Sequence, residues 1–282
     1  MCRHTKTIFL LLLLLICLLS LGSCQRGDSA ARVRFYFLDV GQGDALLIRT
    51  PEGDVLVDAG DESAQELLCL RLEQLGVKSL RLAVFTHPDE DHIGGADGIL
   101  SRFQTDEIWI SGAPMENEAA RRLLEEANAR QTAITVVQGR EVQPIGGAYF
   151  AVLAPIGDVS EGGNESSIVL RVQFGERVAI LTGDADSKGE EMLVERYGRS
   201  QLACDLYKVG HHGSNTSSSV AFLRTMRPTY AVISCGASNS YGHPTGEVLA
   251  KLRDEGITVL RTDRCGEIVF ETDGDYLRYL GE

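Results

Sequence analysis

The strongest constraint on the fold of this chain is an alternation of short apolar runs with amphipathic segments, which occurs in both halves of the sequence. Gly, Pro and Asp separate the apolar runs, a pattern typical of β-strands joined by turns. The amphipathic segments repeat apolar residues at helical spacing, as at Leu68 and Leu72, and Gly76 ends that pattern. Expected strands are 33–40, 45–49, 55–57, 80–85, 106–110, 132–137, 149–153, 167–174, 178–181, 206–209, 230–234, 258–260, 267–271 and 276–280, and expected helices are 64–75, 116–130, 188–197, 217–226 and 245–255. Two sets of strands with helices between them predict a two-sheet sandwich covered by helices.

Composition narrows the class of protein. The chain has 282 residues, of which 44% are apolar and 24% charged, so it is neither a disordered nor a collagen-like chain. A domain of this length buries enough apolar surface to fold without a disulfide or a metal. The 40 acidic residues outnumber the 27 basic ones, and the net charge of −13 argues against a basic nucleic-acid-binding module. That charge does not exclude an enzyme that acts on phosphates through bound metal.

The one continuous apolar stretch lies at the N-terminus. Arg3 and Lys6 precede residues 8–19, which carry no polar side chain, and small residues follow. This is the layout of an export signal, and the run is shorter than the ~20 residues of a spanning helix. The sequence therefore predicts export and argues against several membrane spans.

A lipidation motif ends this segment. Leu21-Gly22-Ser23-Cys24 resembles a bacterial lipobox, in which the cysteine, here Cys24, carries lipid. The alternatives are cleavage by ordinary signal peptidase and an uncleaved anchor. We expect a lipoprotein-type signal peptide at 1–23, a linker at 24–31 and one folded domain at 32–282.

The remaining cysteines add little. Cys2 and Cys17 lie in the signal, and the other four are far apart, without any C-x-x-C spacing: Cys69, Cys204, Cys235 and Cys265. We expect buried apolar side chains, with no disulfide and no cysteine–zinc site.

Histidine is the most informative residue type. One of the six, His4, lies in the signal, and the other five are confined to three short segments, 86–92, 210–213 and 242–244. Each segment follows an expected strand and is flanked by Gly or Pro, the usual setting for functional side chains on a rigid scaffold. Histidines in ordinary surface or core roles would be scattered, so this clustering indicates a functional site.

The first segment carries His87, Asp89, Asp91 and His92. Two imidazoles and two carboxylates suit borderline or hard divalent metals. In an extended loop alternate residues point the same way, so the first three can converge while His92 reaches to the side. This spacing allows two adjacent metals, one held by the first two residues and the other by the last two. The alternative is a polar loop that caps a following helix.

Two single residues extend the candidate ligand set. Asp184 follows the expected strand 178–181, where its two oxygens can bridge two metals, although Gly-Asp at a strand end is also a common turn. His243, in Tyr241-Gly242-His243-Pro244, lies between an expected strand and an expected helix and completes the count of ligands.

The segment 211–216 combines imidazoles with small hydrogen-bond donors. One imidazole, His211 or His212, can bind metal or donate a proton. The candidate substrate-binding residues Ser214, Asn215 and Thr216 can hold an anion at the start of the following helix. Such a site suits a tetrahedral phosphate better than a flat carbonyl. An ordinary helix cap is the alternative, and both can be true at once.

Six motifs are far more specific together than any one of them alone. They lie at 38–44, 57–60, 86–95, 181–184, 208–219 and 241–244. Together they resemble the metallo-β-lactamase superfamily and, within it, the soluble hydrolase domain of ComEC-type DNA-internalisation proteins. The resemblance covers the domain from about 33 to 280. It implies an α/β fold, an αββα sandwich of two mixed sheets with helices on the outer faces, and a two-metal site at one edge that takes two divalent ions, Zn²⁺ or Mn²⁺.

The ligand pattern departs from the superfamily's usual His-x-His-x-Asp-His, because Asp89 takes the place of the second histidine. The superfamily's next histidine would fall near 164–167, where this sequence has none. Both substitutions look like those of the ComEC branch, so they do not indicate a dead enzyme. They leave the first metal position poorer in nitrogen ligands, and His211 can supply the missing one.

On this basis we expect the following roles. The second metal position, with Asp91, His92, Asp184 and His243, is the more complete. Asp91 orients the attacking water, Asp184 bridges the metals, and His211 or His212 protonates the leaving oxygen. Lys208 assists with charge. Asp39, Asp44 and Asp58 support the loops, Asp39 and Asp58 from beneath.

The leading functional hypothesis is an exported, lipid-anchored hydrolase that uses metal-activated water to cut phosphodiesters, with DNA as a candidate substrate. Its expected partners are that phosphodiester and the membrane, contacted through the N-terminal lipid. No stable nucleic-acid-binding surface is expected on a chain this acidic. ComEC-type proteins join this domain to membrane spans and a channel, and since this sequence shows no such spans we do not expect DNA import by this chain alone. The alternatives are a metallo-hydrolase of another ester, thioester or lactam, and a non-catalytic metal-containing binding protein.

Overall fold

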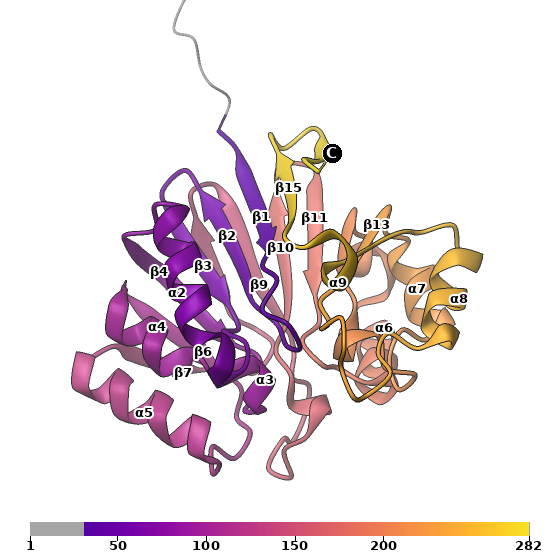
Figure 1. The fold of residues 1–282 in the computed structure, drawn as a ribbon. Coiled ribbons are helices and arrows are strands. Elements are labelled where there is room, and N and C mark those ends of the chain that lie inside the picture. The colour runs from indigo at the N-terminus through magenta and orange to yellow at the C-terminus, as the bar shows by residue number, and fades with distance from the viewer. Residues whose placement is uncertain (1–30, 282) are drawn as a thin grey trace, which may run out of the picture. The chain divides into compact units, whose positions relative to one another are not determined.

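The structure, a computed structural model, describes residues 31–281 (Figure 1). The expected signal peptide, the expected lipidation site Cys24 and the linker up to residue 30 lie outside the described residues. Within the described part, strands and helices alternate along the chain in two groups, as the sequence pattern predicts.

The first sheet is mixed. Its strands are β1 (Val33–Phe37), β2 (Leu46–Thr50), β3 (Gly53–Val57), β4 (Ser79–Phe85), β5 (Gln104–Thr105), β6 (Glu107–Ile110), β7 (Ala133–Val136), β15 (Ile268–Thr272) and β16 (Leu277–Tyr279). They lie in the order β16-β15-β1-β2-β3-β4-β6-β7, and β5 pairs with β4. β1 is antiparallel to β2 and β15, whereas β3, β4, β6 and β7 run parallel. The C-terminal hairpin thus completes a sheet that the N-terminal half begins.

The second sheet is also mixed. Its strands are β8 (Val142–Ile145), β9 (Ala148–Ala154), β10 (Val169–Phe174), β11 (Arg177–Leu181), β12 (Leu206–Lys208), β13 (Tyr230–Ile233) and β14 (Thr258–Arg261). They lie in the order β14-β13-β12-β11-β10-β9-β8. The strands from β8 to β11 are antiparallel, and those from β11 to β14 are parallel.

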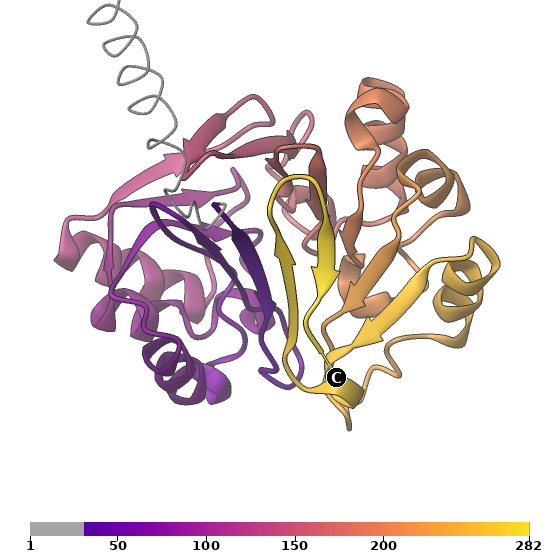
Figure 2. The same cartoon turned by 90° about the horizontal axis from the view of Figure 1, so that it is seen from above.

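Helices cover the outer face of each sheet (Figures 1 and 2). On the first sheet lie α2 (Gln65–Gln74), α4 (Ala96–Arg102) and α5 (Glu118–Arg130), and on the second lie α6 (Ser187–Leu202), α7 (Val220–Met226) and α8 (Gly246–Asp254). Shorter helical turns are η1 (Glu62–Ala64), α3 (Glu90–Ile93), η2 (Asn164–Ser166), η3 (Gly210–Gly213) and α9 (Thr262–Cys265). The predicted αββα sandwich of two mixed sheets is confirmed.

Three apolar layers hold these four structural layers together, and strand alternation decides which layer each side chain joins. In β1, Phe35 and Phe37 lie between the two sheets, whereas Tyr36 faces the helices of the first sheet. In β11, Leu181 lies between the sheets and Ile180 faces the helices of the second. A strand buried on both faces reads as a continuous apolar run, which is why the sequence predicted these strands well.

Several elements differ from the sequence-based expectation, and three of them, β8, α4 and α7, differ for a clear local reason. β8 was not expected because it contains Pro144, but β8 is the last strand of its sheet, where a missing N–H is tolerated. α4 was not expected either, since Gly98 interrupts its helical pattern. α7 begins at Val220 and not at 217, because the Ser219 hydroxyl accepts the Phe222 N–H at 3.3 Å and so caps the helix there.

The strands that precede the chemically active residues end at neighbouring edges of the two sheets. In the first sheet β3 and β4 are parallel, and they lead into Asp58 and His87. In the second sheet β11, β12 and β13 are parallel, and they lead into Asp184, His211 and the loop of His243. Because parallel strands end on the same side of a sheet, residues far apart in sequence meet at one place.

The cysteines of the described residues (Cys69, Cys204, Cys235 and Cys265) are free, and the first three are buried. Burial raises the pKa of the Cys204 and Cys235 thiols, so both behave as small apolar side chains. Between residues 31 and 281 no helix combines the length and the apolarity that crossing a membrane requires.

Candidate metal centre

The segment after β4 forms a helical turn, so the expectation of an extended loop is wrong. Asp89 has an extended backbone, and its carbonyl accepts the His92 N–H at 3.0 Å, which starts α3. Successive side chains of a helical turn do not alternate between two sides, so Asp91 and His92 point differently from the expected arrangement. The Asp89 side chain is 54% exposed, whereas His87 and His92 are buried.

Two of the buried imidazoles are oriented by hydrogen bonds at Nδ1. His92 Nδ1–H donates to Asp58 Oδ2 at 2.8 Å. The Thr86 hydroxyl donates to the same carboxylate at 2.8 Å, so its oxygen accepts from His87 Nδ1, which lies 3.2 Å away. With hydrogen on Nδ1, each Nε2 carries a lone pair that faces the centre of the site.

The turn η3 brings a third imidazole into the same space. His211 and His212 have positive φ angles of 49° and 52°, which are uncommon for residues with a side chain. His212 Nδ1–H donates to the Ser234 carbonyl at 2.9 Å, and its Nε2 therefore also faces the site with a lone pair. A backbone of this kind cannot be predicted from strand or helix periodicity.

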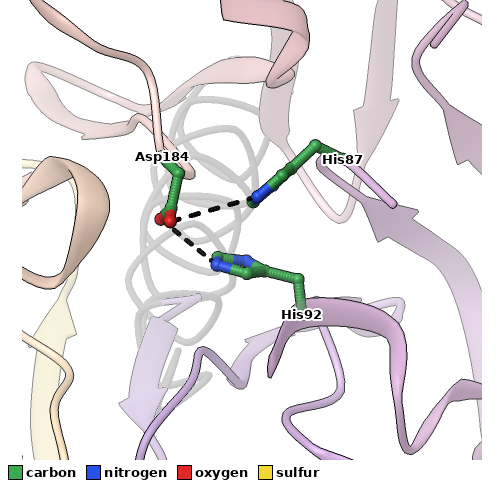
Figure 3. Close-up of side chains that lie close together, drawn as sticks. All are labelled: His87, His92 and Asp184. Carbon is green, nitrogen blue, oxygen red and sulfur yellow. Dashed lines mark ion pairs between the residues drawn. The ribbon is translucent and has the colours of Figure 1, made fainter. Parts of the chain in front are cut away.

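Five side chains converge at this point. His92 Nε2 lies 3.2 Å from Asp184 Oδ1 and 3.3 Å from His212 Nε2. His212 Nε2 is 3.2 Å from Asp91 Oδ2. His87 Nε2 lies 4.0 Å from Asp184 Oδ2, so His87 and His92 approach the Asp184 carboxylate from two sides (Figure 3).

These contacts fit a divalent cation. Lone pairs on His92 Nε2 and His212 Nε2 repel each other at 3.3 Å unless a positive charge lies between them. His87 Nε2 and Asp184 Oδ1 are buried without a hydrogen-bond partner, which is costly for polar atoms. Four groups of three possible ligand atoms lie within 4.8 Å of one another: His87/His92/Asp184, Asp91/His92/His212, Asp44/Asp58/His92 and Asp44/Asp184/His212. Imidazole with carboxylate suits Zn²⁺ or Mn²⁺.

The carboxylates and imidazoles strongly shift each other's protonation. Burial disfavours the charged form of His92, yet Asp184 and Asp58 outweigh it and raise the pKa of His92 well above its usual range. Burial likewise acts to raise the pKa of Asp91, but the hydrogen bond from His212 and the charge of His92 lower it below its usual range. The ligand set is therefore arranged to hold positive charge, and protons and cations compete for it.

Lys208 is placed differently from its expected role. Its Nζ forms a buried ion pair with Asp44 and donates to the Gly183 carbonyl at 3.2 Å. It lines a small internal cavity behind the site and not the open pocket, so the expectation that it assists with charge at the substrate is corrected. Instead Lys208 neutralises Asp44 and holds the turn that carries Asp184.

The three aspartates expected to support the loops differ in burial: Asp44 and Asp58 are buried, and Asp39 is exposed. Asp58 is buried and accepts the Thr86 N–H at 2.8 Å in addition to the bonds described above. The Asp44 N–H donates to the Asp91 carbonyl at 3.0 Å. Asp39 lies on the surface, not beneath the site, where its carboxylate accepts the Gly41 N–H at 3.2 Å.

His211 and His243 lie beside the central cluster. His211 Nε2 is 3.8 Å from Asp184 Oδ2, and its Nδ1 lies 3.0 Å from Thr216 Oγ1 and 3.1 Å from Asn164 Nδ2. The His243 ring is 5.6 Å from that of His211, and none of the four groups of ligand atoms includes it. His212 thus occupies the position beside Asp91 that the sequence analysis assigned to His243. The sequence could not predict this, because nothing in two adjacent histidines indicates which of them points into the site.

The cluster opens into a pocket of about 110 Å³. Its lining residues are the carboxylates Asp89, Asp91 and Asp184, the imidazoles His211, His212 and His243, and two uncharged residues, Gln42 and Tyr241. Burial lowers the pKa of His211 and of His243, so each ring gives up a proton more readily than a free imidazole does.

The expected anion site at a helix N-terminus is wrong. Ser214, Asn215 and Thr216 precede α7 and do not line the pocket, because the helix begins only at Val220. The backbone N–H groups of Ser218 and Ser219 are taken by the Glu190 carboxylate, at 2.6 and 2.7 Å. Within the described residues this end of the helix is occupied by the protein's own anion.

Sequence comparisons identify relatives of this arrangement. A family profile described as "Metallo-beta-lactamase superfamily" matches residues 38–237. The chain is 32% identical over 251 residues to ComE operon protein 3 of Bacillus subtilis, covering 83% of this chain and 32% of that protein. It is 37% identical over 233 residues to competence protein ComA of Neisseria gonorrhoeae, covering 82% of this chain and 31% of that protein. The chain therefore spans about a third of the length of these relatives.

Solved structures share the fold at low identity. CmlA, a diiron β-hydroxylase from Streptomyces venezuelae, matches with a TM-score of 0.57 and 14% identity, over 89% of this chain and 54% of that one. A diphosphatase of the PhnP family matches with a TM-score of 0.50 and 17% identity, over 85% of this chain and 98% of that one. At such identities the likeness concerns the fold alone.

Proposed function

Because this chain belongs to the metallo-β-lactamase superfamily and is homologous to part of several competence proteins, we propose that it is a metal-dependent hydrolase of phosphodiesters, with DNA as a candidate substrate. The observation that carries the proposal is the convergence of three imidazole Nε2 atoms, those of His87, His92 and His212, on the carboxylates of Asp91 and Asp184, which line an open pocket. A cluster of buried imidazoles and carboxylates does not stabilise an apolar core, and its nitrogen and oxygen atoms are suitable ligands for divalent cations.

The site offers two overlapping positions for divalent ions. His92, His212 and Asp91 would hold one ion, His87 with Asp89 the other, and Asp184 lies between the two groups. Bound there, the ions supply Lewis acidity that polarises a phosphoryl oxygen and lowers the pKa of water. Zn²⁺ and Mn²⁺ both suit these ligands.

The protein's own residues then orient and move protons. Asp91 keeps its charge at neutral pH, because His212 and His92 lower its pKa, and so it can accept a hydrogen bond from the attacking water. His211 lines the pocket, and with Nδ1 held by Thr216 and Asn164 its Nε2 faces the substrate side. We assign His211, and not the more deeply buried His212, the transfer of a proton to the leaving oxygen.

The preference for phosphodiesters is supported by the relatives. Of the related proteins, one is named competence protein ComA and another, from Haemophilus influenzae, is named recombination protein 2. The N–H groups before α7 give no support for a bound phosphate, because the Glu190 carboxylate accepts from them. Hydrolysis of another ester, a thioester or a lactam is the outcome against which the proposal is tested. Export and lipid anchoring through Cys24 belong to the same proposal.

The test is a substrate panel on the full chain, solubilised in detergent and loaded separately with zinc and with manganese. We expect cleavage of bis(p-nitrophenyl) phosphate and single-stranded DNA, and its loss in Asp184→Asn. Asp39→Asn is the matched control, because Asp39 is an exposed aspartate outside the pocket. Turnover of a lactam or thioester, with no phosphodiester cleavage under either metal, would overturn the proposal.

A further inference from the structure

One lining residue of the pocket has no part in holding the cluster. Tyr241 lies in the loop between β13 and α8, and its ring stacks on that of His243 with centroids 5.7 Å apart and planes inclined by 23°. Its side chain contributes to the pocket wall together with Asp91 and Asp184. Tyr241 is nevertheless 67% exposed. One face of the ring is thus covered by His243, while most of the residue remains open to solvent.

The side chains that line the pocket do not favour the binding of a negatively charged nucleic acid. Among the described residues that line it, three are carboxylates and none is Lys or Arg. The chain as a whole carries a net charge of −13. Proteins that bind nucleic acids usually obtain most of their affinity from Lys and Arg on phosphates. A nucleic-acid strand reaching this pocket therefore needs an attraction that does not depend on protein cations.

Stacking on an aromatic ring is such an attraction. Base–aromatic stacking contributes about 1–3 kcal/mol per base and tolerates every sequence, because each base has a flat face. It requires an exposed ring close to the strand's path and a base whose own face is free. Tyr241 meets the first requirement, and bases of a single strand meet the second.

We propose that Tyr241 is a stacking platform for an unpaired nucleobase next to the scissile phosphodiester, which makes the substrate class a single-stranded nucleic acid or a nucleotide diester. This inference rests on the proposed hydrolase function of the same site. The His243 ring stacks on one face of the Tyr241 ring and holds it in place. The Tyr241 side chain therefore loses little conformational freedom when a base stacks on its other face. In a duplex both faces of a base are already covered, and the platform selects against paired strands.

The kinetic test compares two single-stranded oligonucleotides with the same backbone, one carrying thymine bases and one abasic throughout. Tyr241→Ala in the full, metal-loaded chain should raise KM for the base-bearing strand about 5- to 150-fold, the equivalent of one lost stacking contact, with little change in kcat. The abasic strand should be cleaved by Tyr241→Ala as by the wild type. Tyr241→Phe keeps the ring and should restore the wild-type KM.

Tyr276 provides a matched control. It is a tyrosine of similar exposure, 71%, in the turn before β16, and it does not line the pocket. Tyr276→Ala should change neither substrate's KM. A rise in KM that is the same for the abasic and the base-bearing strand, or a loss of bound metal in Tyr241→Ala, would show that Tyr241 only positions His243, and the platform would be rejected.

A second readout does not depend on cleavage. The chain has a single tryptophan, Trp109, and it is only 3% exposed. Tyr241→Trp adds an exposed reporter, whose fluorescence should be quenched by a cleavage-resistant phosphorothioate single strand but not by its abasic counterpart. Tyr276→Trp should not respond. If the wild type cleaves no phosphodiester while Tyr241→Trp is quenched, the proposed function fails and the platform stands. Cleavage without quenching and without a KM effect supports the proposed function and rejects the platform.

Discussion

At the scale of single residues, the hydrogen bond at one ring nitrogen decides what the other nitrogen can do. Asp58 makes no contact with the pocket, yet it accepts the Nδ1–H of His92 and so leaves a lone pair on the Nε2 that faces Asp184. Thr86 links the same carboxylate to His87. One buried aspartate therefore orients two candidate ligands, which is a common way of tuning a metal site.

Asp58→Asn should weaken metal binding about 10- to 100-fold, because an amide replaces the charged acceptor of His92 Nδ1–H. The measurement is a competition titration with a chromogenic chelator. Asp39→Asn, which removes an exposed carboxylate that only accepts the Gly41 N–H, should bind metal like the wild type. Equal affinities of all three proteins would show that Asp58 does not act through His92.

His211→Ala should distinguish proton transfer from metal ligation. A DNA diester expels an alkoxide that needs a proton, so its kcat should fall about 10²- to 10⁴-fold. A p-nitrophenyl diester expels a stable anion and should lose much less, while the metal content stays at the wild-type level. Loss of metal together with an equal fall for both substrates would make His211 a ligand instead.

At the scale of elements, loops with special backbone geometry place the side chains. The loop between β1 and β2 contains Gly41 and Gly43, both with positive φ angles, of 76° and 128°. A Cβ at Gly41 would meet nothing within 4 Å, whereas one at Gly43 would come within 2.3 Å of the Asp91 carbonyl oxygen. Close approach of this loop to α3 therefore depends on glycine at one position and not at the other.

Gly43→Ala should displace Asp91 and lower both metal affinity and activity. Gly41→Ala is the matched control: it shares the cost of a side chain at positive φ, of order 1 kcal/mol, without the collision. Metal titration and thermal unfolding of the two variants separate the effects. If both lose metal equally, backbone strain and not contact with Asp91 is responsible.

The link between α6 and the loop of the second sheet should be pH-dependent. Burial raises the pKa of Glu190 to about 7. The hydrogen bonds from the Ser218 and Ser219 N–H groups favour the ionised form and so act in the opposite direction, but burial outweighs them. Since the unfolded value is near 4.5, the folded protein binds more protons between these pH values. The contribution of Glu190 to stability is thus fully present below about pH 4.5 and lost as pH rises through 7.

Urea unfolding of the wild type and of Glu190→Gln at pH 5 and pH 8 measures this link. The wild type should lose up to about 3 kcal/mol relative to the variant over that range. Taking the difference between the two proteins removes the pH dependence of the metal site, which both share. Parallel stability curves would place the pKa of Glu190 near its ordinary value.

At the scale of the whole molecule, the two sheets bring a site together from opposite halves of the chain. His87 and His92 come from the first sheet, and Asp184 and His212 come from the second. Three of the four groups of candidate ligand atoms combine residues from both halves of the chain. Metal bound between them would stabilise the folded state relative to the unfolded chain.

The location of the whole protein is tested at a residue outside the described range. Cys24→Ser should block lipid incorporation and leave the precursor at its full mass, because lipoprotein processing requires that cysteine. Metabolic labelling with palmitate and fractionation of membranes measure this. An unchanged mature mass and unchanged membrane retention in the variant would refute the lipobox.

Local patterns in the sequence determined the elements and the residue types of the site. Strands buried on both faces and the Leu-rich helix α2 were recognised because their signals span only a few neighbouring residues. The six motifs taken together resemble the metallo-β-lactamase superfamily, and that resemblance implies its αββα sandwich; both are confirmed. These properties follow from short-range sequence, so no tertiary contact was needed to predict them.

Only the tertiary structure decided where individual side chains point. His212 and not His243 lies beside Asp91, and Lys208 turns inward to Asp44. The first outcome depends on the backbone of a loop, where His212 has a positive φ, and both depend on partners more than a hundred residues away. Periodicity carries no information about either, because loop conformation is set by the packing of two sheets that meet only in the folded chain.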